Sequence, residues 1–256
     1  MSGDSYLRRD GCPICAAPRD AATLACRSEP PAETLPLVAE SAFASTYTRR
    51  RVFFSYYRCR VCGGLYCPVY YTPAQLDRLY RHQPENMAEV PVAAREATQR
   101  AYFDILRRHA SLEGEYLELG PDIGLFVRLC AEKGRFFNLH LFEPNRDVHW
   151  ALAECLAGQS IHISRDPYQR GILPKGSLST VVLIHVLDHL IDPAGLLRDL
   201  YDDLAPGGTV FIVTHDEASL LARLLGKRWP PYALQHPQLF SCHTIKQLLE
   251  RCSFVV

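Results

Sequence analysis

The sequence predicts an α/β protein with a doubly wound, mostly parallel sheet and a small N-terminal zinc-binding domain. Three observations lead to this prediction. Strands and helices alternate from residue 115 onward, strand 178–184 is apolar throughout, and residues 1–80 contain two Cys-x-x-Cys pairs. A continuous β-branched strand is typical of a parallel sheet that helices cover on both faces. The two parts of the chain are therefore expected to be stabilised differently, one by a sheet core and one by a metal.

The composition limits the classes of partner. The chain has 256 residues, 48% of them hydrophobic, which suits one large domain or one medium domain with a small appendage. The formal net charge is +0, so no general field attracts nucleic acid or a membrane surface. Even the run Arg49-Arg50-Arg51 is interpreted as a solvated face. We expect neither nucleic acid nor a membrane as a partner.

The sequence has neither a membrane-spanning run nor a secretory signal, and this indicates the cellular compartment. No apolar run approaches the roughly 20 residues that span a bilayer. The N-terminus has no apolar segment of the secretory type. The sequence therefore predicts a cytoplasmic protein, in which the ten cysteines are metal ligands or buried residues and not disulfides.

Two cysteine pairs predict a metal site. Each Cys-x-x-Cys turn can present two thiolates to one ion, and two such turns complete a tetrahedral zinc site. The predicted zinc ligands are Cys12, Cys15, Cys59 and Cys62. The alternative is four free thiols in a reducing compartment.

A closed site with four protein ligands leaves no position for substrate or water, so the predicted zinc is structural. Residues 1–80 are expected to have little apolar mass, and a metal would then stabilise them. Cys26 and Cys67 have no partner at motif spacing and are expected to be small buried residues.

A linker and a helix precede the sheet. Thr72 and Pro73 predict the start of a helix over 72–80, and alanines at helical spacing predict another over 93–110. The second helix braces the sheet, or Tyr102 closes over a bound ligand. The predicted domains are a zinc-binding domain (1–80), a linker with the bracing helix (81–111) and a sheet domain (112–256).

The segment EYLELGPDIG, residues 115–124, organises the sheet domain. It combines a short apolar strand, an acidic residue, a glycine turn and the start of a helical run. A strand that breaks at Gly120 and resumes as a helix after Gly124 has the form of a phosphate- or nucleoside-binding turn. The next strand, 136–143, ends in Glu143, from which a carboxylate can accept hydrogen bonds from both ribose hydroxyls.

Later strands bring further polar groups to the same edge. A strand over 161–164 ends near Asp166, and strand 178–184 is followed by His185. Ligands of parallel sheets bind at the carboxyl ends of the strands. Gly120, Glu143, Asp166 and His185 are therefore expected to share one edge.

The remaining elements are a helix after residue 193, a fifth strand and a last helix. The predicted helix ends at Ala205-Pro206-Gly207-Gly208, and the fifth strand covers 209–214. Thr244 and Gln247 predict a capping box for the last helix.

Four motifs carry a family resemblance. They are ELGPDIG (118–124), FEP (142–144), the segment 181–214 with its HxxDH, DP and PGG, and LFSCHTIKQLLERCSF (239–254). Residues 95–256 thereby resemble a class I S-adenosylmethionine-dependent methyltransferase, whose fold is a Rossmann-like sheet. The double Cys-x-x-Cys resembles the zinc-binding region that precedes this fold in some sugar and small-molecule methyltransferases.

The resemblance implies S-adenosylmethionine as cofactor and a small molecule or sugar as methyl acceptor. Glu118, Gly120 and Gly124 match the motif that wraps the methionine portion, and Asp122 replaces its usual middle glycine. Glu143 matches the acid that binds the ribose.

The resemblance extends to the adenine site and to the C-terminus. Asp166 lies where the family contacts the adenine amino group. The family fold also has two further strands, which this sequence does not reach. We therefore expect a fragment, or a partner such as a second copy that completes the sheet.

A histidine is the most suitable general base near neutral pH, and His185 is the first candidate. His189 is the second, with Asp188 beside it, although both could simply tie the loop to the next helix. Because the three residues follow i, i+3, i+4 spacing, a helical turn would align them as a divalent-metal site. This resembles the Glu-x-x-Glu-His arrangement of some quinone O-methyltransferases.

An aromatic loop should overhang the site. His236 and His243 flank this loop. Trp229, Tyr232 and His236 could contact a ring or sugar substrate, or could simply pack.

Two other functions compete. A nicotinamide-dependent oxidoreductase would require GxGxxG, and this chain has only GPDIG. The third candidate is a non-catalytic zinc-ribbon interaction protein on a degenerate methyltransferase fold.

Overall fold

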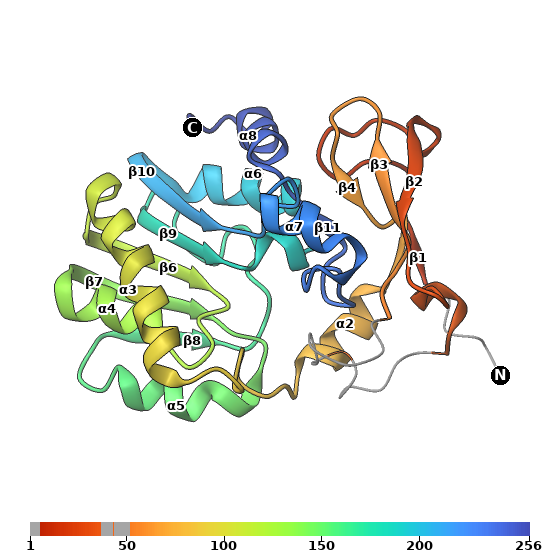
Figure 1. Ribbon diagram of the computed structural model, residues 1–256. Coiled ribbons are helices and arrows are strands. Elements are labelled where there is room, and N and C mark those ends of the chain that lie inside the picture. The colour runs from red at the N-terminus through yellow and green to blue at the C-terminus, as the bar shows by residue number, and fades with distance from the viewer. Residues whose placement is uncertain (1–5, 37–42, 44–51) are drawn as a thin grey trace. The chain divides into compact units, whose positions relative to one another are not determined.

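The computed structural model describes residues 6–36, 43 and 52–256 (Figure 1). The chain divides into two compact units. Met1–Leu79, Leu187–Arg198 and Thr214–Val256 form the cysteine unit; Tyr80–Val186 and Asp199–Val213 form the sheet unit. The domain limits inferred from sequence stay a prediction, and the run Arg49-Arg50-Arg51 lies outside the described residues.

The sheet unit contains five parallel strands in the order β10-β9-β6-β7-β8. In chain order they are β6 (Glu113–Leu119), β7 (Arg135–Phe142), β8 (Ile161–Ser164), β9 (Leu178–Ile184) and β10 (Leu204–Val213). The predicted Rossmann-like α/β class is confirmed. One detail of the prediction is wrong: Ala205-Pro206-Gly207-Gly208 lies within β10 and does not end the preceding helix.

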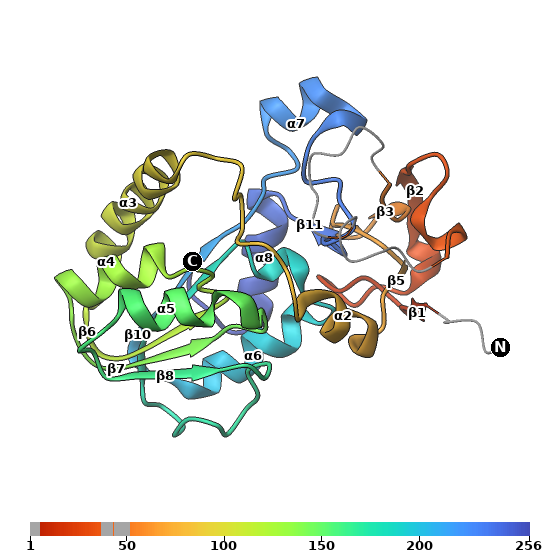
Figure 2. The ribbon, with the colours of Figure 1, turned by 90° about the horizontal axis from the view of Figure 1, so that it is seen from below.

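Helices cover the sheet on both faces (Figure 2). Helices α3, α4 and α5 lie on one face, and the C-terminal part of α6 lies on the other. The bounds are α3 (Val92–His109), α4 (Leu125–Lys133), α5 (His149–Cys155), which the 3-10 turn η3 (Arg146–Val148) precedes, and α6 (Pro193–Asp203). The core of the first face combines Phe103 and Leu106 of α3, Phe126 and Val127 of α4, and Leu152 of α5. Burial of these apolar side chains is the main force that holds the helices on the sheet.

The register aligns the strand ends. Leu119, the last residue of β6, pairs with Phe142 of β7 and with Leu183 of β9. Strand β6 has its sequential neighbour β7 on one side and the much later β9 on the other, so the strand order reverses there. Ligands of open α/β sheets bind at such a reversal, beside the carboxyl ends of the strands.

The described residues of the cysteine unit form two small antiparallel sheets, β1-β5 and β11-β4-β3-β2. The strands in this part of the chain are β1 (Leu7–Arg8), β2 (Ala22–Cys26), β3 (Tyr56–Cys59), β4 (Leu65–Tyr66), β5 (Val69–Tyr70) and β11 (Gln238–Leu239). The described α-helices are α7 (Leu220–Leu225), α8 (Cys242–Arg251), α2 (Pro73–Tyr80), which ends at the unit boundary, and the N-terminal part of α6. The described 3-10 turns are η1 (Arg19–Ala21), η2 (Ala32–Thr34), η4 (Leu187–His189) and η5 (Gly226–Arg228).

The cysteine unit has an aromatic core. Phe54 contacts Tyr70 and Tyr71 with ring centroids 5.0 and 4.9 Å apart, and Phe53 stacks on Tyr232 at 5.4 Å. The expectation of little apolar mass in residues 1–80 is therefore wrong. It overlooked that tyrosine and phenylalanine bury large areas even in short, irregular strands.

The last helix begins earlier than predicted. Ser241 caps α8, and its hydroxyl accepts from the Thr244 N–H at 3.2 Å while the Thr244 hydroxyl accepts from the Ser241 N–H at 2.8 Å. The predicted pairing of Thr244 with Gln247 is wrong, because Thr244 is the second member of this capping box. Among the described residues, no helix is both long enough and apolar enough to cross a membrane.

Candidate cofactor and metal sites

The turn after β6 has an unusual backbone. Gly120, Asp122 and Gly124 all have positive φ, at +66°, +53° and +83°. The Gly120 N–H donates to the carbonyl oxygen of Phe142 at 2.9 Å, which ties the turn to β7. A Cβ on Gly124 would lie 2.6 Å from Cys155 Sγ, so a larger residue would force the Cys155 side chain of α5 to shift.

Asp122 takes the conformation that the usual middle glycine would take. Aspartate is one of the few residues that enter the left-handed region at modest strain. Its two carboxylate oxygens accept from the Asn86 N–H, each at 3.2 Å. The substitution therefore preserves the shape of the turn and adds a link to the segment before α3.

Glu143 follows β7 and is buried, with 6% of its surface exposed. One carboxylate oxygen accepts from the Asp122 N–H at 2.9 Å and the other from the Asn145 N–H at 2.8 Å. Burial raises the pKa of Glu143 to about 7; these two N–H groups oppose the rise and Asp122 adds to it. Glu143 thus joins the turn to β7 and changes its charge near neutral pH.

Glu118, the penultimate residue of β6, is also buried. The hydroxyl of Tyr116 donates to Glu118 Oε2 at 2.6 Å. Burial raises the pKa of Glu118 to about 8; the Tyr116 hydrogen bond lowers it and the charge of Glu143 raises it. Burial likewise raises the pKa of Asp122. Three acidic groups with raised pKa values, one in this turn and two beside it, favour a cationic ligand, because a nearby positive charge would stabilise their ionised forms.

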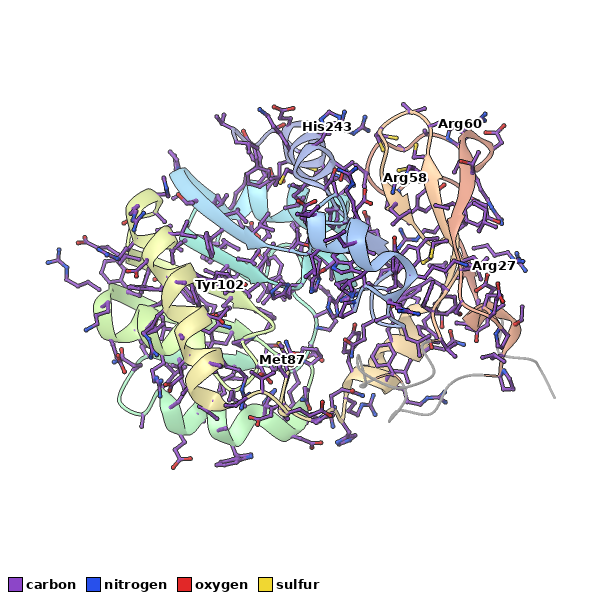
Figure 3. All side chains as sticks on the ribbon, in the orientation of Figure 1. Arg27, Arg58, Arg60, Met87, Tyr102 and His243 are labelled. Carbon is purple, nitrogen blue, oxygen red and sulfur yellow. The ribbon has the colours of Figure 1, made fainter. Side chains whose placement is uncertain are left out.

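Asp166 and His185 occupy the ends of the flanking strands. Asp166 is exposed two residues after β8. His185 follows β9, with φ +52°, and its N–H donates to the carbonyl oxygen of Val213 at 2.8 Å. Its ring makes an edge contact with Tyr102 of α3 at 6.5 Å between centroids (Figure 3).

The predicted helical alignment of His185 with Asp188 and His189 is wrong. Turn η4 begins only at Leu187, and the positive φ of His185 turns the chain before it. The three residues therefore do not share one helical face.

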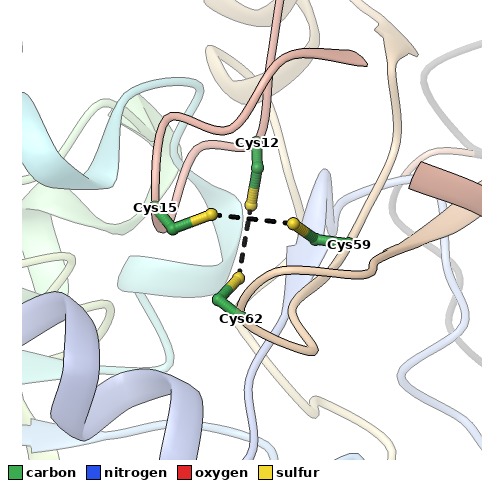
Figure 4. A group of neighbouring side chains, drawn as sticks. All are labelled: Cys12, Cys15, Cys59 and Cys62. Atoms are coloured by element: carbon green, nitrogen blue, oxygen red, sulfur yellow. Dashed lines mark hydrogen bonds between the residues drawn. The ribbon is translucent and has the colours of Figure 1, made fainter. Parts of the chain in front are cut away.

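The four cysteines of the two Cys-x-x-Cys pairs converge in the cysteine unit (Figure 4). The sulfurs of Cys12 and Cys62 lie 3.6 Å apart, as do those of Cys15 and Cys59. With Zn–S bonds of about 2.3 Å, a tetrahedral site has S···S edges of about 3.8 Å. Burial and the neighbouring thiols of Cys62 and Cys59 raise the pKa of Cys15 to about 11. A bound cation would explain why four cysteine side chains gather at one point, since it stabilises thiolates.

A second polar cluster lies in the same unit. Asp188 is fully buried, and one carboxylate oxygen accepts from His215 Nδ1 at 2.6 Å. His189 Nε2 lies 3.1 Å from Nε2 of the buried His236. Sequence reasoning missed His215 and assigned His236 to a substrate loop, because no motif spacing connects either residue with Asp188.

The other aromatic-loop residues pack. Trp229 is 5% exposed, and its ring meets that of Tyr232 edge-on at 5.7 Å. His243 is exposed near the start of α8 (Figure 3). A role of Trp229, Tyr232 and His236 toward substrate stays a prediction, and none was predicted for His243.

The comparisons with known proteins agree with this fold. A family model described as a methyltransferase domain matches residues 94–256. No curated protein sequence matches the chain.

Several solved structures align with part of this chain. A SAM-dependent methyltransferase from Leishmania major is 17% identical over 62% of this chain and 61% of that one, with a TM-score of 0.46. An S-adenosylmethionine-dependent methyltransferase from Mesorhizobium loti is 18% identical over 61% and 80%, with a TM-score of 0.49. The [4+2]-cyclase SpnF is 16% identical over 61% and 57%, also with a TM-score of 0.49. The chain spans less than two thirds of the Leishmania protein and of the cyclase, and these similarities concern the fold alone.

Proposed function

The chain belongs to the methyltransferase-domain family, and from this premise we propose that it transfers a methyl group from S-adenosylmethionine to a small-molecule or sugar-type acceptor. The observation that carries the proposal is the turn after β6, which has three residues with positive φ and which the Asp122 N–H ties to Glu143, the buried acid at the end of β7. Such a turn lets a ligand approach the backbone closely at the reversal of strand order.

Each predicted cofactor residue has a role that its position supports. Gly120, Asp122 and Gly124 shape the cradle for the methionine portion, next to the N-terminus of α4. Glu143 would accept hydrogen bonds from the ribose hydroxyls through the lone pairs that its two backbone donors leave available. Glu118 would offset the positive charge of the cofactor, and the exposed Asp166 would contact the adenine amino group.

The electrostatics favour this cofactor over a nicotinamide dinucleotide. S-adenosylmethionine carries a sulfonium cation, whereas a dinucleotide would bring a doubly negative pyrophosphate to the same turn. Glu118, Asp122 and Glu143 all gather there, and their ionised forms would repel the pyrophosphate.

His185 is the proposed general base. It follows β9 at the reversal of strand order, which is where the acceptor would meet the methyl group. Asp188 is a weaker candidate, because it is fully buried and already bound to His215. His189 is likewise weaker, since its Nε2 faces His236.

The four cysteines are proposed to hold a structural zinc ion. They would supply four thiolates in a closed tetrahedron, with no open position for chemistry. The ion would therefore hold the two cysteine turns together and take no part in methyl transfer. The cytoplasmic location and an association with a second copy stay predictions from the sequence.

A ligand comparison tests the cofactor. Thermal unfolding is measured with S-adenosylmethionine, S-adenosylhomocysteine or NADH at equal concentration. We expect both S-adenosyl compounds to raise the melting temperature and NADH to leave it unchanged. Stabilisation by NADH alone would favour the oxidoreductase. Binding without methyl transfer to any acceptor in a broad panel would favour the non-catalytic interaction protein.

A substitution tests the base. His185→Asn keeps a residue that tolerates positive φ and removes the imidazole. We expect kcat to fall about 10²–10⁴-fold while the affinity for S-adenosylhomocysteine is retained. Unchanged turnover would exclude His185 as the base.

A further inference from the structure

The polar cluster of the cysteine unit consists of Asp188, His189, His215 and His236. One ligand atom from each of Asp188, His189 and His236 lies within 4.8 Å of the others. We propose that these three residues bind one divalent first-row transition-metal ion, at a site distinct from the four cysteines.

His236 is held in the tautomer that a metal requires. The ring is buried, and Nδ1 donates to the carbonyl oxygen of Pro231 at 2.7 Å. In a neutral ring Nε2 is then an unprotonated acceptor. The hydroxyl of Tyr56 fixes the backbone by donating to the His236 carbonyl oxygen at 2.6 Å. A carbonyl that orients the far nitrogen of a ligating histidine is the usual outer-shell arrangement of metal sites.

The spacing of the two histidines fits two ligands of one ion. Their Nε2 atoms are 3.1 Å apart. With metal–nitrogen bonds of about 2.0–2.1 Å, adjacent ligands of an octahedral or tetrahedral site lie about 2.9–3.4 Å apart. Without an ion, the same distance is an N–H···N hydrogen bond from His189 to His236, because the Nε2 atom of His236 has no proton to donate.

Asp188 supplies the negative charge. It is fully buried, and no described residue donates a hydrogen bond to its Oδ1 atom. One carboxylate oxygen accepts from His215 Nδ1, and the other has no described donor, which leaves it available to a cation. A buried carboxylate with an unpartnered oxygen is costly, and a bound cation would remove that cost.

The donor set defines the kind of ion. Two imidazole nitrogens and one carboxylate oxygen suit zinc, iron(II) or cobalt(II), and three protein ligands leave positions open for water or a small molecule. The partly exposed His215, whose side chain is 29% accessible, provides a route of entry. The inference does not depend on methyl transfer, and metal binding can be measured alone.

Cobalt binding tests the site. The purified protein is dialysed against increasing Co²⁺, and bound cobalt and zinc are both measured per chain. Cobalt bound by sulfur absorbs strongly through sulfur-to-metal charge transfer, so cobalt at the cysteines would be recognised. We expect the wild type to bind about one cobalt ion per chain with only weak visible bands.

Variants separate the cluster from adventitious sites. His236→Ala and His189→Gln should each weaken cobalt binding by about 100-fold or more, and His215→Gln by about 10–100-fold through the outer shell. The matched control is His243→Ala, an exposed histidine outside the cluster, which should bind as the wild type does. Unaltered zinc content shows that the variants remain folded. If His236→Ala does not fold, His189→Gln provides the test of the site. Equal cobalt binding by the wild type and by His189→Gln, or cobalt that shows only sulfur charge transfer, would overturn the proposal.

Discussion

The four-cysteine site and the turn after β6 are built in opposite ways. At the cysteines, side chains provide everything: four sulfurs converge, and their S···S distances of 3.6 Å match a tetrahedron. At the turn, the backbone provides the shape, and the acidic side chains mainly fix that shape and set its charge. A site made of side chains should fail when one of them is replaced. A site made of backbone should tolerate any residue that keeps the conformation, as Asp122 does in the position of a glycine.

The largest expected effect is at the cysteines. Cys59→Ser removes one of four ligands, and we expect loss of bound zinc together with a decrease in the free energy of unfolding of the cysteine unit by more than about 5 kcal/mol. Elemental analysis and chemical denaturation measure both quantities. The control is Cys26→Ser, which replaces a buried cysteine outside the cluster and should retain zinc. Zinc retention by Cys59→Ser would contradict the assignment.

The second effect is a pH dependence of the free energy of unfolding, which comes from Glu118 beside the turn. Because burial raises the pKa of Glu118 to about 8, the folded state binds a proton that the unfolded state releases above its ordinary value near 4.5. This stabilisation is complete below about pH 4.5 and is lost as the pH rises through about 8. Glu118→Gln keeps an acceptor for Tyr116 and removes this loss. The free energy of unfolding of this variant minus that of the wild type should increase by about 3–5 kcal/mol between pH 4.5 and pH 8.5. A difference that does not change with pH would contradict the raised pKa.

The third effect compares two glycines. Gly124→Ala meets both a positive φ and the Cys155 sulfur, whereas Gly158→Ala meets a positive φ of +88° in open space. We expect Gly158→Ala to lower the free energy of unfolding by about 1–2 kcal/mol, and Gly124→Ala by about 1–3 kcal/mol more. Thermal or denaturant unfolding measures both. Equal losses would mean that the close approach to α5 is unimportant.

The smallest expected effect is at Asp122. Asp122→Gly restores the usual glycine, relieves the positive φ and loses the link to Asn86. These changes oppose each other, so the free energy of unfolding should change by less than about 1 kcal/mol. Calorimetry should find cofactor affinity within about threefold of wild type. A much larger change would show that the side chain, and not the backbone, makes the site.

The sequence predicted most of the sheet because the spacing of apolar residues and the glycines that end an element are local signals. The apolar run 178–184 became β9, and the glycine turn of residues 120–124 ended β6 and began α4. The cysteine cluster was equally predictable, since each Cys-x-x-Cys pair is a local turn and only the pairing of the two turns is long-range.

Long-range contacts explain what was missed. His215 and His236 join Asp188 and His189 from segments far along the chain, and no spacing rule links them. The failed alignment of His185 has a different cause: its positive φ interrupts the helical spacing that the sequence suggested. The cap of α8 was misplaced by three residues because Thr244 was interpreted as the first member of a capping box, whereas it is the second member of the box that begins at Ser241.

The most direct test of the central claim is a calorimetric titration with S-adenosylmethionine at pH 6 and pH 7.5. Burial raises the pKa of Glu143 to about 7, and in the proposed cofactor site only its ionised form would accept from both ribose hydroxyls. We expect the affinity of the wild type to rise about eightfold between the two pH values as Glu143 loses its proton. Glu143→Gln should bind S-adenosylmethionine more weakly and should lack this rise. Ionisation of the cofactor itself would affect both proteins equally, so the variant is the control for it. No binding by the folded wild type, or the same rise in Glu143→Gln, would contradict the account.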